Sequence, residues 1–157
     1  MHGIIYATTE GKKTLEAKLE ELISLRASIA EQIKDAREFG DLKENVEYAA
    51  AREAQVNLEE EISDIKNKLS TIKLFSYSKA DTSAVNVGCR VKIENQISKK
   101  TEEWIITGVI ENNPEKGYVS NETPLGKALL GSKKGDVVEI KMPAGKVKYK
   151  ILNILTA

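Results

Sequence analysis

The sequence is poor in the residues that build most metal and nucleophilic sites. Its 157 residues include one cysteine, Cys89, and one histidine, His2. A single cysteine forms no internal disulfide, and zinc sites with several histidine or cysteine ligands are excluded by count. Ser-His-Asp triads and Cys-His nucleophiles would depend on His2 alone. We therefore expect neither a zinc protein nor a hydrolase of these types.

Aromatic residues and long apolar runs are also scarce. Aromatics make up 5% of the chain, against 41% hydrophobic and 31% charged residues. No stretch approaches the roughly 20 apolar residues needed to cross a bilayer, and residues 1–6 lack the pattern of a secretory signal. The composition still supports a core, with long helices carrying much of the fold. We expect a cytoplasmic protein with no membrane partner.

The chain has no net charge, but its two halves differ. Residues 1–75 hold 11 basic and 15 acidic side chains, whereas residues 76–157 hold 13 and 9. All three prolines and seven of the ten glycines lie in the second half, which favours helix first and strands with turns afterwards. We predict a helical domain over residues 1–75, a polar linker over 76–83 and a globular domain over 84–157. The basic excess of the globular domain can assist docking on an acidic surface or attract nucleic acid.

Apolar residues in the first half recur at spacings of three and four, in two stretches separated by Gly40. This is the period of a coiled coil, and Gly40 suits the left-handed end of a helix. Thr8 or Thr9 can cap the first helix, and Arg26 interrupts the stripe at a seam position, where its stem can lie over the hairpin. The stretches predict an antiparallel hairpin in one register. In each pair the residue numbers sum to 84: Leu15 with Leu69, Leu19 with Ile65, Leu22 with Ile62, Ile33 with Ala51 and Ala36 with Tyr48.

Two carboxylates lie at the predicted turn of this hairpin. Asp41 and Glu44 are three residues apart, which fits a capping box with Asp41 as the N-cap of the second helix. The same pair can instead be delivered to Mg²⁺, which binds one or two carboxylates together with the phosphate oxygens of a substrate. Two acidic groups do not complete an octahedral site, so a partner would supply the other ligands. Spacing alone favours the cap, and the two interpretations are compatible.

Two motifs carry a resemblance to the bacterial Gre family of transcript-cleavage factors. The first resembles the family's hairpin tip: Ala36-Arg37-Glu38-Phe39-Gly40-Asp41-Leu42-Lys43-Glu44-Asn45-Val46-Glu47-Tyr48, then Ala50-Ala51-Arg52-Glu53. The second is similar to the family's C-terminal motif, which usually has serine where this chain has Thr123: Ser120-Asn121-Glu122-Thr123-Pro124-Leu125-Gly126-Lys127-Ala128-Leu129-Leu130-Gly131. The motifs come in the expected order, so the resemblance covers nearly the whole chain. Few basic residues near the tip favour a GreA-like over a GreB-like member.

The resemblance implies a function for this architecture. In the family, the coiled-coil hairpin enters the secondary channel of RNA polymerase, and a globular domain similar to the FKBP fold docks near the channel's outer rim. When the polymerase has backtracked, the tip acids help it bind a second Mg²⁺ and position a water that hydrolyses the extruded RNA 3′ end. By motif match these acids are Asp41 and Glu44. The protein would be a monomer that rescues arrested complexes, with no cofactor of its own, and would stimulate the polymerase's nuclease without being an enzyme.

The resemblance also implies roles for residues outside the acidic pair. Arg37 and Arg52, near the tip, would contact the phosphates of the extruded RNA; the alternative is a solvated helix face with carboxylate neighbours. The C-terminal motif would dock on the polymerase through Ser120, Thr123, Pro124, Leu125 and Gly126.

The second half is predicted to be mainly β. Thr123 followed by Pro124 starts one short helix, which Gly131 ends, and we expect Cys89 and Trp104 in the core. The whole chain is therefore predicted to be α+β, a long antiparallel coiled-coil hairpin plus an FKBP-like, mainly β domain with one short helix. The alternating runs typical of strands cover residues 88–93, 103–110, 136–140 and 147–152, with turns at Asn113-Pro114 and Pro143-Ala144-Gly145.

Three other functions stay open at this point. An inhibitory paralogue would bind the channel without restoring cleavage, which the presence of both Asp41 and Glu44 disfavours. An FKBP-like chaperone with isomerase activity needs an apolar pocket; the globular half has Trp104 but no phenylalanine, so we expect no aromatic cluster there. A structural coiled-coil adaptor would need the tip acids for stability only.

Overall fold

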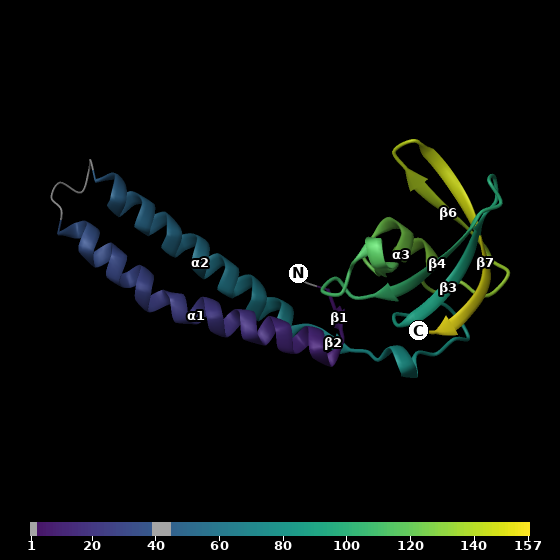
Figure 1. Ribbon diagram of the computed structural model, residues 1–157, viewed down its shortest axis with the longest axis horizontal. Helices are drawn as coiled ribbons and strands as arrows, with labels where there is room; N and C mark the ends of the chain where they lie inside the picture. Colours follow the sequence, from purple (N-terminus) through teal and green to yellow (C-terminus); the bar gives the residue numbers. More distant parts are fainter. Residues whose placement is uncertain (1–2, 39–44) are drawn as a thin grey trace. The chain divides into compact units, whose positions relative to one another are not determined.

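The computed structural model describes residues 3–38 and 45–157, and in these ranges two long helices precede a mainly β chain (Figure 1). The predictions for Gly40, Asp41 and Glu44 lie outside the described residues. The N-terminal elements are β1 (Ile5–Ala7), α1 (Thr9–Arg37), α2 (Val46–Ser70) and β2 (Ile72–Leu74). The C-terminal elements are β3 (Cys89–Asn95), β4 (Thr101–Thr107), β5 (Tyr118–Ser120), α3 (Pro124–Leu129), β6 (Val137–Met142) and β7 (Gly145–Thr156), with short 3₁₀ helices at Tyr77–Lys79 and Pro114–Lys116. The α+β class is confirmed.

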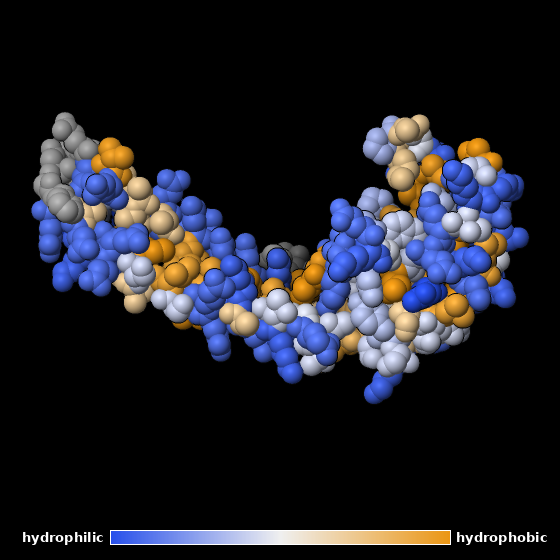
Figure 2. Space-filling model, viewed as in Figure 1, coloured by the Kyte–Doolittle hydropathy of each residue, from blue (hydrophilic) through white to orange (hydrophobic). Residues whose placement is uncertain are grey.

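The two long helices pack through the predicted apolar stripe. Its buried members include Leu22, Ile33, Ala36, Ala51, Leu58, Ile62 and Ile65. On the face shown in Figure 2, hydrophilic residues cover much of both helices and hydrophobic residues show between them. Cross-helix contacts join Arg26 to Glu59 and Arg37 to Tyr48. The numbers of each pair sum to 85, which agrees with the predicted register to within one residue.

The chain divides differently from the predicted domain boundaries. One compact unit is made mainly of residues 12–71, and the other combines residues 4–11 with 72–157. The reason is that β1 pairs in parallel with β2, and the amide of Phe75 donates to the carbonyl of Ala7 at 3.0 Å. Residues on both sides of the helical segment therefore join the globular unit. The predicted linker also contains ordered structure, because Tyr77 lies in a 3₁₀ helix and shares a 2.8 Å hydrogen bond with Thr107.

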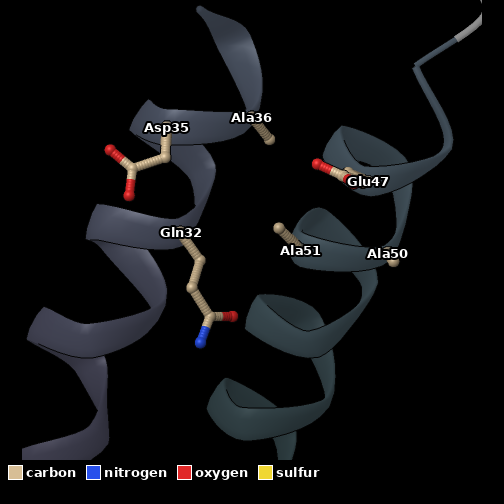
Figure 3. A pocket seen from close by; sticks show the side chains of 6 residues that line it. All are labelled: Gln32, Asp35, Ala36, Glu47, Ala50 and Ala51. Carbon is tan, nitrogen blue, oxygen red and sulfur yellow. The ribbon is translucent and has the colours of Figure 1, made fainter. Parts of the chain in front are cut away.

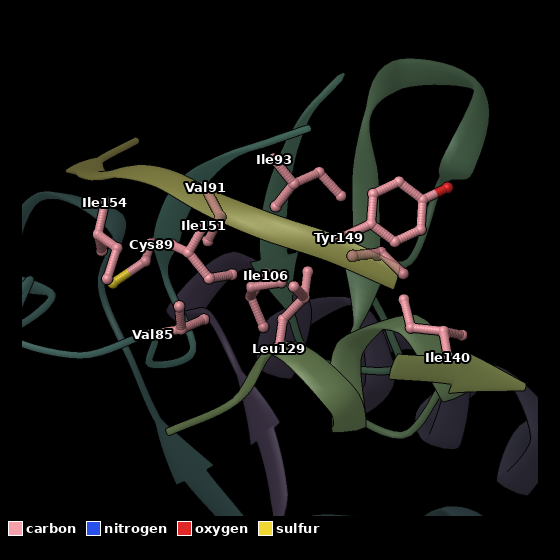
Figure 4. Packing of buried hydrophobic residues seen from close by; sticks show 11 residues of the cluster. Val85, Cys89, Val91, Ile93, Ile106, Leu129, Ile140, Tyr149, Ile151 and Ile154 are labelled. Carbon is pink, nitrogen blue, oxygen red and sulfur yellow. The ribbon is translucent and has the colours of Figure 1, made fainter. Parts of the chain in front are cut away.

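The globular unit is built on a five-stranded sheet in the order β5-β4-β3-β7-β6. Neighbouring strands are antiparallel except β4 and β5, which are parallel. Side chains from the strands and from α3 pack together in Figure 4. The buried cluster comprises Val85, Cys89, Val91, Ile93, Ile106, Val119, Leu129, Ile140, Tyr149, Ile151 and Ile154. The prediction that Cys89 fills the core is confirmed, whereas Trp104 lies half-buried at the cluster's edge.

The prediction that no aromatic cluster forms in the globular unit is wrong. Phe75 and Tyr77 pack edge to face with ring centroids 5.2 Å apart, and Tyr77 lies 6.0 Å from Tyr118. The prediction rested on the lack of phenylalanine after the linker. It missed that the β1–β2 pairing brings Phe75 and the 3₁₀ helix into this unit.

Candidate functional site

The structure changes the assignment of the helix cap at the hairpin tip. α1 ends at Arg37, and α2 begins at Val46 with Asn45 as its N-cap. The Asn45 side-chain oxygen accepts a hydrogen bond from the Tyr48 amide at 3.0 Å. Asparagine and aspartate are comparably good N-caps, so spacing could not choose between them. The prediction that Asp41 caps the second helix is wrong, and Asp41 and Glu44 themselves lie outside the described residues.

Asn45 also reaches the other helix. Its side-chain nitrogen donates a hydrogen bond to the carbonyl of Ala36, in the last turn of α1. The last carbonyls of a helix have no partner within the helix, so this bond satisfies a group that would otherwise depend on water. One side chain therefore links the end of α1 to the start of α2. The resemblance assigned Asn45 no role.

The two arginines predicted to contact RNA lie near the same tyrosine. The Arg37 guanidinium sits over the Tyr48 ring, 5.7 Å from its centroid, and donates a long hydrogen bond of 3.5 Å to the phenol oxygen. This hydrogen bond, together with the charges of Arg37 and Arg52, lowers the pKa of Tyr48. Arg52 donates to Gln55 at 3.4 Å. Both arginines are exposed.

A hollow of about 390 Å³ lies between the helices next to the tip. Small side chains create it: Ala36 and Ala51 point into the space between α1 and α2, and Asp35 and Glu47 contribute carboxylates from the two helices (Figure 3). Neither of these acids was expected from the sequence to belong to a site. Within residues 3–38 and 45–157, no group of three or more His, Cys, Asp or Glu residues could hold a metal ion.

The predicted docking segment begins at the end of β5. Ser120 is buried, its amide donates to Asn112 at 2.7 Å, and its carbonyl accepts from the Thr123 hydroxyl at 2.7 Å. Thr123 in turn caps α3 by accepting from the Gly126 amide at 3.0 Å. The predicted cap and short helix are confirmed, and Gly131 follows with a left-handed φ of 79°.

The five predicted docking residues differ in what they present to solvent. Pro124 is exposed, while Thr123 and Leu125 are half-buried. Ser120 and Gly126 are buried, and a Cβ on Gly126 would overlap the backbone carbonyl of Ser120. Ser120 and Gly126 therefore shape the segment, and Pro124 is the member most available to a partner.

A carboxylate that the sequence analysis missed holds the first turn of α1. Glu111 accepts from the Thr8 amide at 2.9 Å and from the Thr8 hydroxyl at 2.8 Å. The Thr8 hydroxyl oxygen accepts from the Gly11 amide at 3.0 Å, which confirms Thr8 as the cap. A carboxylate is favourable at the positive end of a helix. Because 103 residues separate Glu111 from Thr8, no local pattern could reveal the pair.

Neither long helix resembles a membrane span. No helix among the described residues is long and apolar enough to cross a bilayer.

Comparisons with known proteins cover both units. Residues 5–74 match the family described as "Transcription elongation factor, N-terminal", and residues 80–156 match "Transcription elongation factor, GreA/GreB, C-term". Transcription elongation factor GreA of Thermoanaerobacter pseudethanolicus is 42% identical over 151 residues, covering 96% of each chain. Its counterpart in Lachnoclostridium phytofermentans is 41% identical over 148 residues, covering 94% of this chain and 92% of that one. The crystal structure of the GreA factor homolog 1 protein of Thermus thermophilus, 22% identical, superimposes with a TM-score of 0.45, covering 96% and 98%. The chain belongs to the GreA/GreB family of transcription elongation factors.

Proposed function

We propose that this elongation factor works in the cytoplasm by placing its hairpin tip in the secondary channel of RNA polymerase. There it stimulates cleavage of the 3′ end of backtracked RNA and so rescues arrested complexes. The observation that carries the proposal is the cap of α2. Because Asn45 caps this helix, the stability of α2 does not require Asp41 or Glu44 as a cap. In the proposal, Asp41 and Glu44 serve the polymerase site instead of the helix cap.

The length of the hairpin supports action at a distance. α1 has 29 residues and α2 has 25, which corresponds to roughly 40 Å at 1.5 Å per residue. Its seam is apolar and its outer residues are largely polar. Such an arm is stable in water and can carry its tip into a narrow channel.

The donor chemistry of the tip fits a shared magnesium ion. Asp41 and Glu44 provide oxygen ligands of the kind that Mg²⁺ prefers, and the polymerase and the RNA would supply the others. When bound there, the ion polarises the scissile phosphate and lowers the pKa of a water. Arg37 and Arg52 hold the extruded RNA by its phosphates. The factor completes a site in another protein, so it acts as a cofactor of the polymerase's nuclease and carries no activity alone.

The exposed part of the C-terminal motif would dock on the polymerase. Pro124 is exposed at the first turn of α3, and Thr123 and Leu125 lie beside it. The Ser120 carbonyl, which accepts from the Thr123 hydroxyl and lies close against Gly126, fixes the position of this turn. A docked globular unit would raise the effective concentration of the hairpin at the channel.

Neutral substitutions of nearly equal size test the proposal. Asp41→Asn and Glu44→Gln remove the two charges, whereas Glu60→Gln and Asp64→Asn remove two exposed charges from α2 as a matched control. We expect all variants to fold and to bind RNA polymerase. Cleavage in backtracked complexes should fall by at least about 100-fold in the tip variants only, since a metal ion supplies several kcal/mol of transition-state stabilisation. Undiminished cleavage by the tip variants would refute the proposed role.

A further inference from the structure

We propose that the outer face of the globular sheet binds the phosphate backbone of duplex DNA, without reading the base sequence. The outer face is the side of β4, β3, β7 and β6 that points away from the buried cluster. It contains neither the tip acids nor the start of α3, so the inference goes beyond the proposed cleavage function. The charged residues of the outer face are Arg90, Lys92, Glu94, Glu103, Glu139, Lys141, Lys146, Lys148 and Lys150.

The alternation of burial along β7 defines the two faces of the sheet. Successive residues of a strand point to opposite sides. Tyr149 belongs to the buried cluster (Figure 4), whereas Lys148 and Lys150 on either side of it are exposed. Glu94 of β3 and Val137 of β6 both pair with Lys150, and residues paired across strands point to the same side. The charged residues of the neighbouring strands therefore share the face of Lys148 and Lys150.

The basic residues of the outer face outnumber its acids by six to three. Two of the six have a carboxylate partner, since Arg90 lies 3.7 Å from Glu103 and Lys146 lies 3.5 Å from Glu139. Four others make no ion pair with a carboxylate of the described residues: Lys92, Lys141, Lys148 and Lys150. Glu94 is the remaining acid of this face. The outer face therefore keeps a surplus of three positive charges that the protein itself does not neutralise.

The lysines of β7 form a regular row. Lys146, Lys148 and Lys150 occupy every second position of the strand, which places their Cα atoms roughly 7 Å apart. Lys141 of β6 lies directly opposite Lys146, and like charges opposite each other destabilise a sheet. Duplex DNA carries one negative charge per roughly 1.7 Å of its axis. A DNA backbone laid along this row neutralises charges that repel one another in the protein alone.

The residue types of the outer face favour a nucleic acid over a protein partner. The centres of protein–protein interfaces are enriched in aromatic residues and depleted in lysine and glutamate. All residues of β4, β3, β7 and β6 are described, and none of those that point outward is aromatic. Lysine ammonium groups bind phosphate as point charges. The face thus has the chemistry of a phosphate-binding surface.

The lack of outward aromatic residues also favours a duplex over a single strand. Proteins bind single strands by stacking the bases on aromatic side chains. In a duplex the bases stay stacked on one another, so that cations alone suffice to hold the backbone. Duplex DNA is also the template of transcription, the process in which this family acts.

A basic surface that only prevents aggregation is the competing explanation. β6 is an edge strand of the sheet, and lysines on edge strands discourage pairing with other chains. In that case the position of the lysines is unimportant for DNA. The matched control is Lys116→Gln with Lys127→Gln, which removes two exposed charges of the globular unit from outside the outer face, at the second 3₁₀ helix and on α3.

The experiment measures binding of the full chain to a short fluorescent DNA duplex of random sequence by anisotropy, at salt concentrations from about 50 to 200 mM. If the four unpaired lysines each neutralise one phosphate, log K should fall with log salt at a slope of about −3.6. Lys148→Gln with Lys150→Gln should weaken binding and bring the slope to about −1.8. The control pair should keep the wild-type slope, and a duplex of unrelated sequence should bind equally well.

A second pair of substitutions guards against a folding defect. Lys92→Gln with Lys141→Gln changes exposed residues of β3 and β6 and should reduce the slope by the same amount, while circular dichroism confirms that all variants are folded. Equal losses in the control pair, or a wild type that does not bind the duplex, would overturn the inference. Tighter binding of a single strand, or equal competition by polyglutamate, would overturn the duplex as the partner. No polymerase is present, so either result leaves the proposed cleavage function to its own test.

Discussion

The guanidinium of Arg26 on α1 donates two hydrogen bonds to the carboxylate of Glu59 on α2, at 2.7 and 2.8 Å. Arg26 occupies a position where the seam would otherwise be apolar. The two side chains remain 43% and 48% exposed, and exposed ion pairs add little to stability. A polar residue at one seam position instead favours one register over others. The expectation that Arg26 only lays its stem over the hairpin missed this directed contact.

The Arg26–Glu59 pair predicts a pH-dependent stability. The hydrogen bond from Arg26, together with the charges of Arg26 and Lys66, lowers the pKa of Glu59 below its ordinary 4.5. A lowered folded-state pKa gives stability above the unfolded value that is lost as pH falls through the folded value. Thermal unfolding should therefore show a small loss of Tm in Glu59→Gln near pH 7. The difference in Tm between the wild type and Glu59→Gln should shrink below pH 4.5. A difference in Tm that does not depend on pH would contradict this account.

Two glycines predict unequal costs for the same substitution. A Cβ on Gly108 would overlap the backbone carbonyl of Tyr6, whereas a Cβ on Gly11 would overlap only the side-chain carboxylate of Glu111. Backbone held by the β1–β2 pairing cannot move aside as a side chain can. We expect Gly108→Ala to cost about 3 kcal/mol or more, and Gly11→Ala roughly 1 kcal/mol after its gain in helix propensity. Denaturant unfolding followed by Trp104 fluorescence measures both, and equal costs would refute the argument.

Much of the hairpin could be predicted from sequence because its information is periodic. Leu22, Ile33 and Ile62 repeat at coiled-coil spacing, and each is buried as expected. The β1–β2 pair could not be predicted, since each strand has three residues and the paired residues Ile5 and Ile72 are 67 positions apart. Segments of three residues contain too little periodic pattern to predict a long-range strand pairing.

Two substitutions of Thr123, at the start of α3, distinguish the role of its hydroxyl as a helix cap from the role of its methyl group. Thr123→Ala removes the hydroxyl that caps α3 and binds the Ser120 carbonyl, so it should cost about 1 kcal/mol and weaken polymerase binding. Thr123→Ser keeps the hydroxyl and should match the wild type in stability and in polymerase binding. Chemical denaturation and a polymerase binding assay test the pair. A Thr123→Ser variant as impaired as Thr123→Ala would show that the methyl group, not the cap, matters.

The thiol of Cys89 should be unreactive towards thiol reagents in the folded protein. It is fully buried, and burial raises the pKa of its thiol above the ordinary 9.0. Because the folded state releases this proton at a higher pH than the unfolded state does, Cys89 should reduce the free energy of unfolding as pH rises above that value. At about pH 8 a thiol reagent should react at the rate of unfolding, and denaturant should accelerate labelling. Immediate labelling of the native protein would contradict the buried position.

At the candidate site the sequence identified the motif but not its supports. Aspartate and asparagine are both good N-caps. Only the observed start of α2 at Val46 shows that Asn45, not Asp41, is the cap. The Asn45 link to Ala36 and the Arg37 contact with Tyr48 depend on how the two helices meet. Side-chain geometry of this kind follows from packing between helices, which residue spacing along one helix does not specify.

The central claim is tested most directly by adding the wild-type protein to backtracked elongation complexes that carry 5′-labelled RNA. The account predicts that, in the presence of Mg²⁺, the labelled RNA shortens faster than with polymerase alone and that elongation then resumes. The acceleration should disappear with the combined Asp41→Asn and Glu44→Gln variant, although this variant still binds. Wild-type protein that binds the polymerase yet leaves the cleavage rate unchanged would contradict the account.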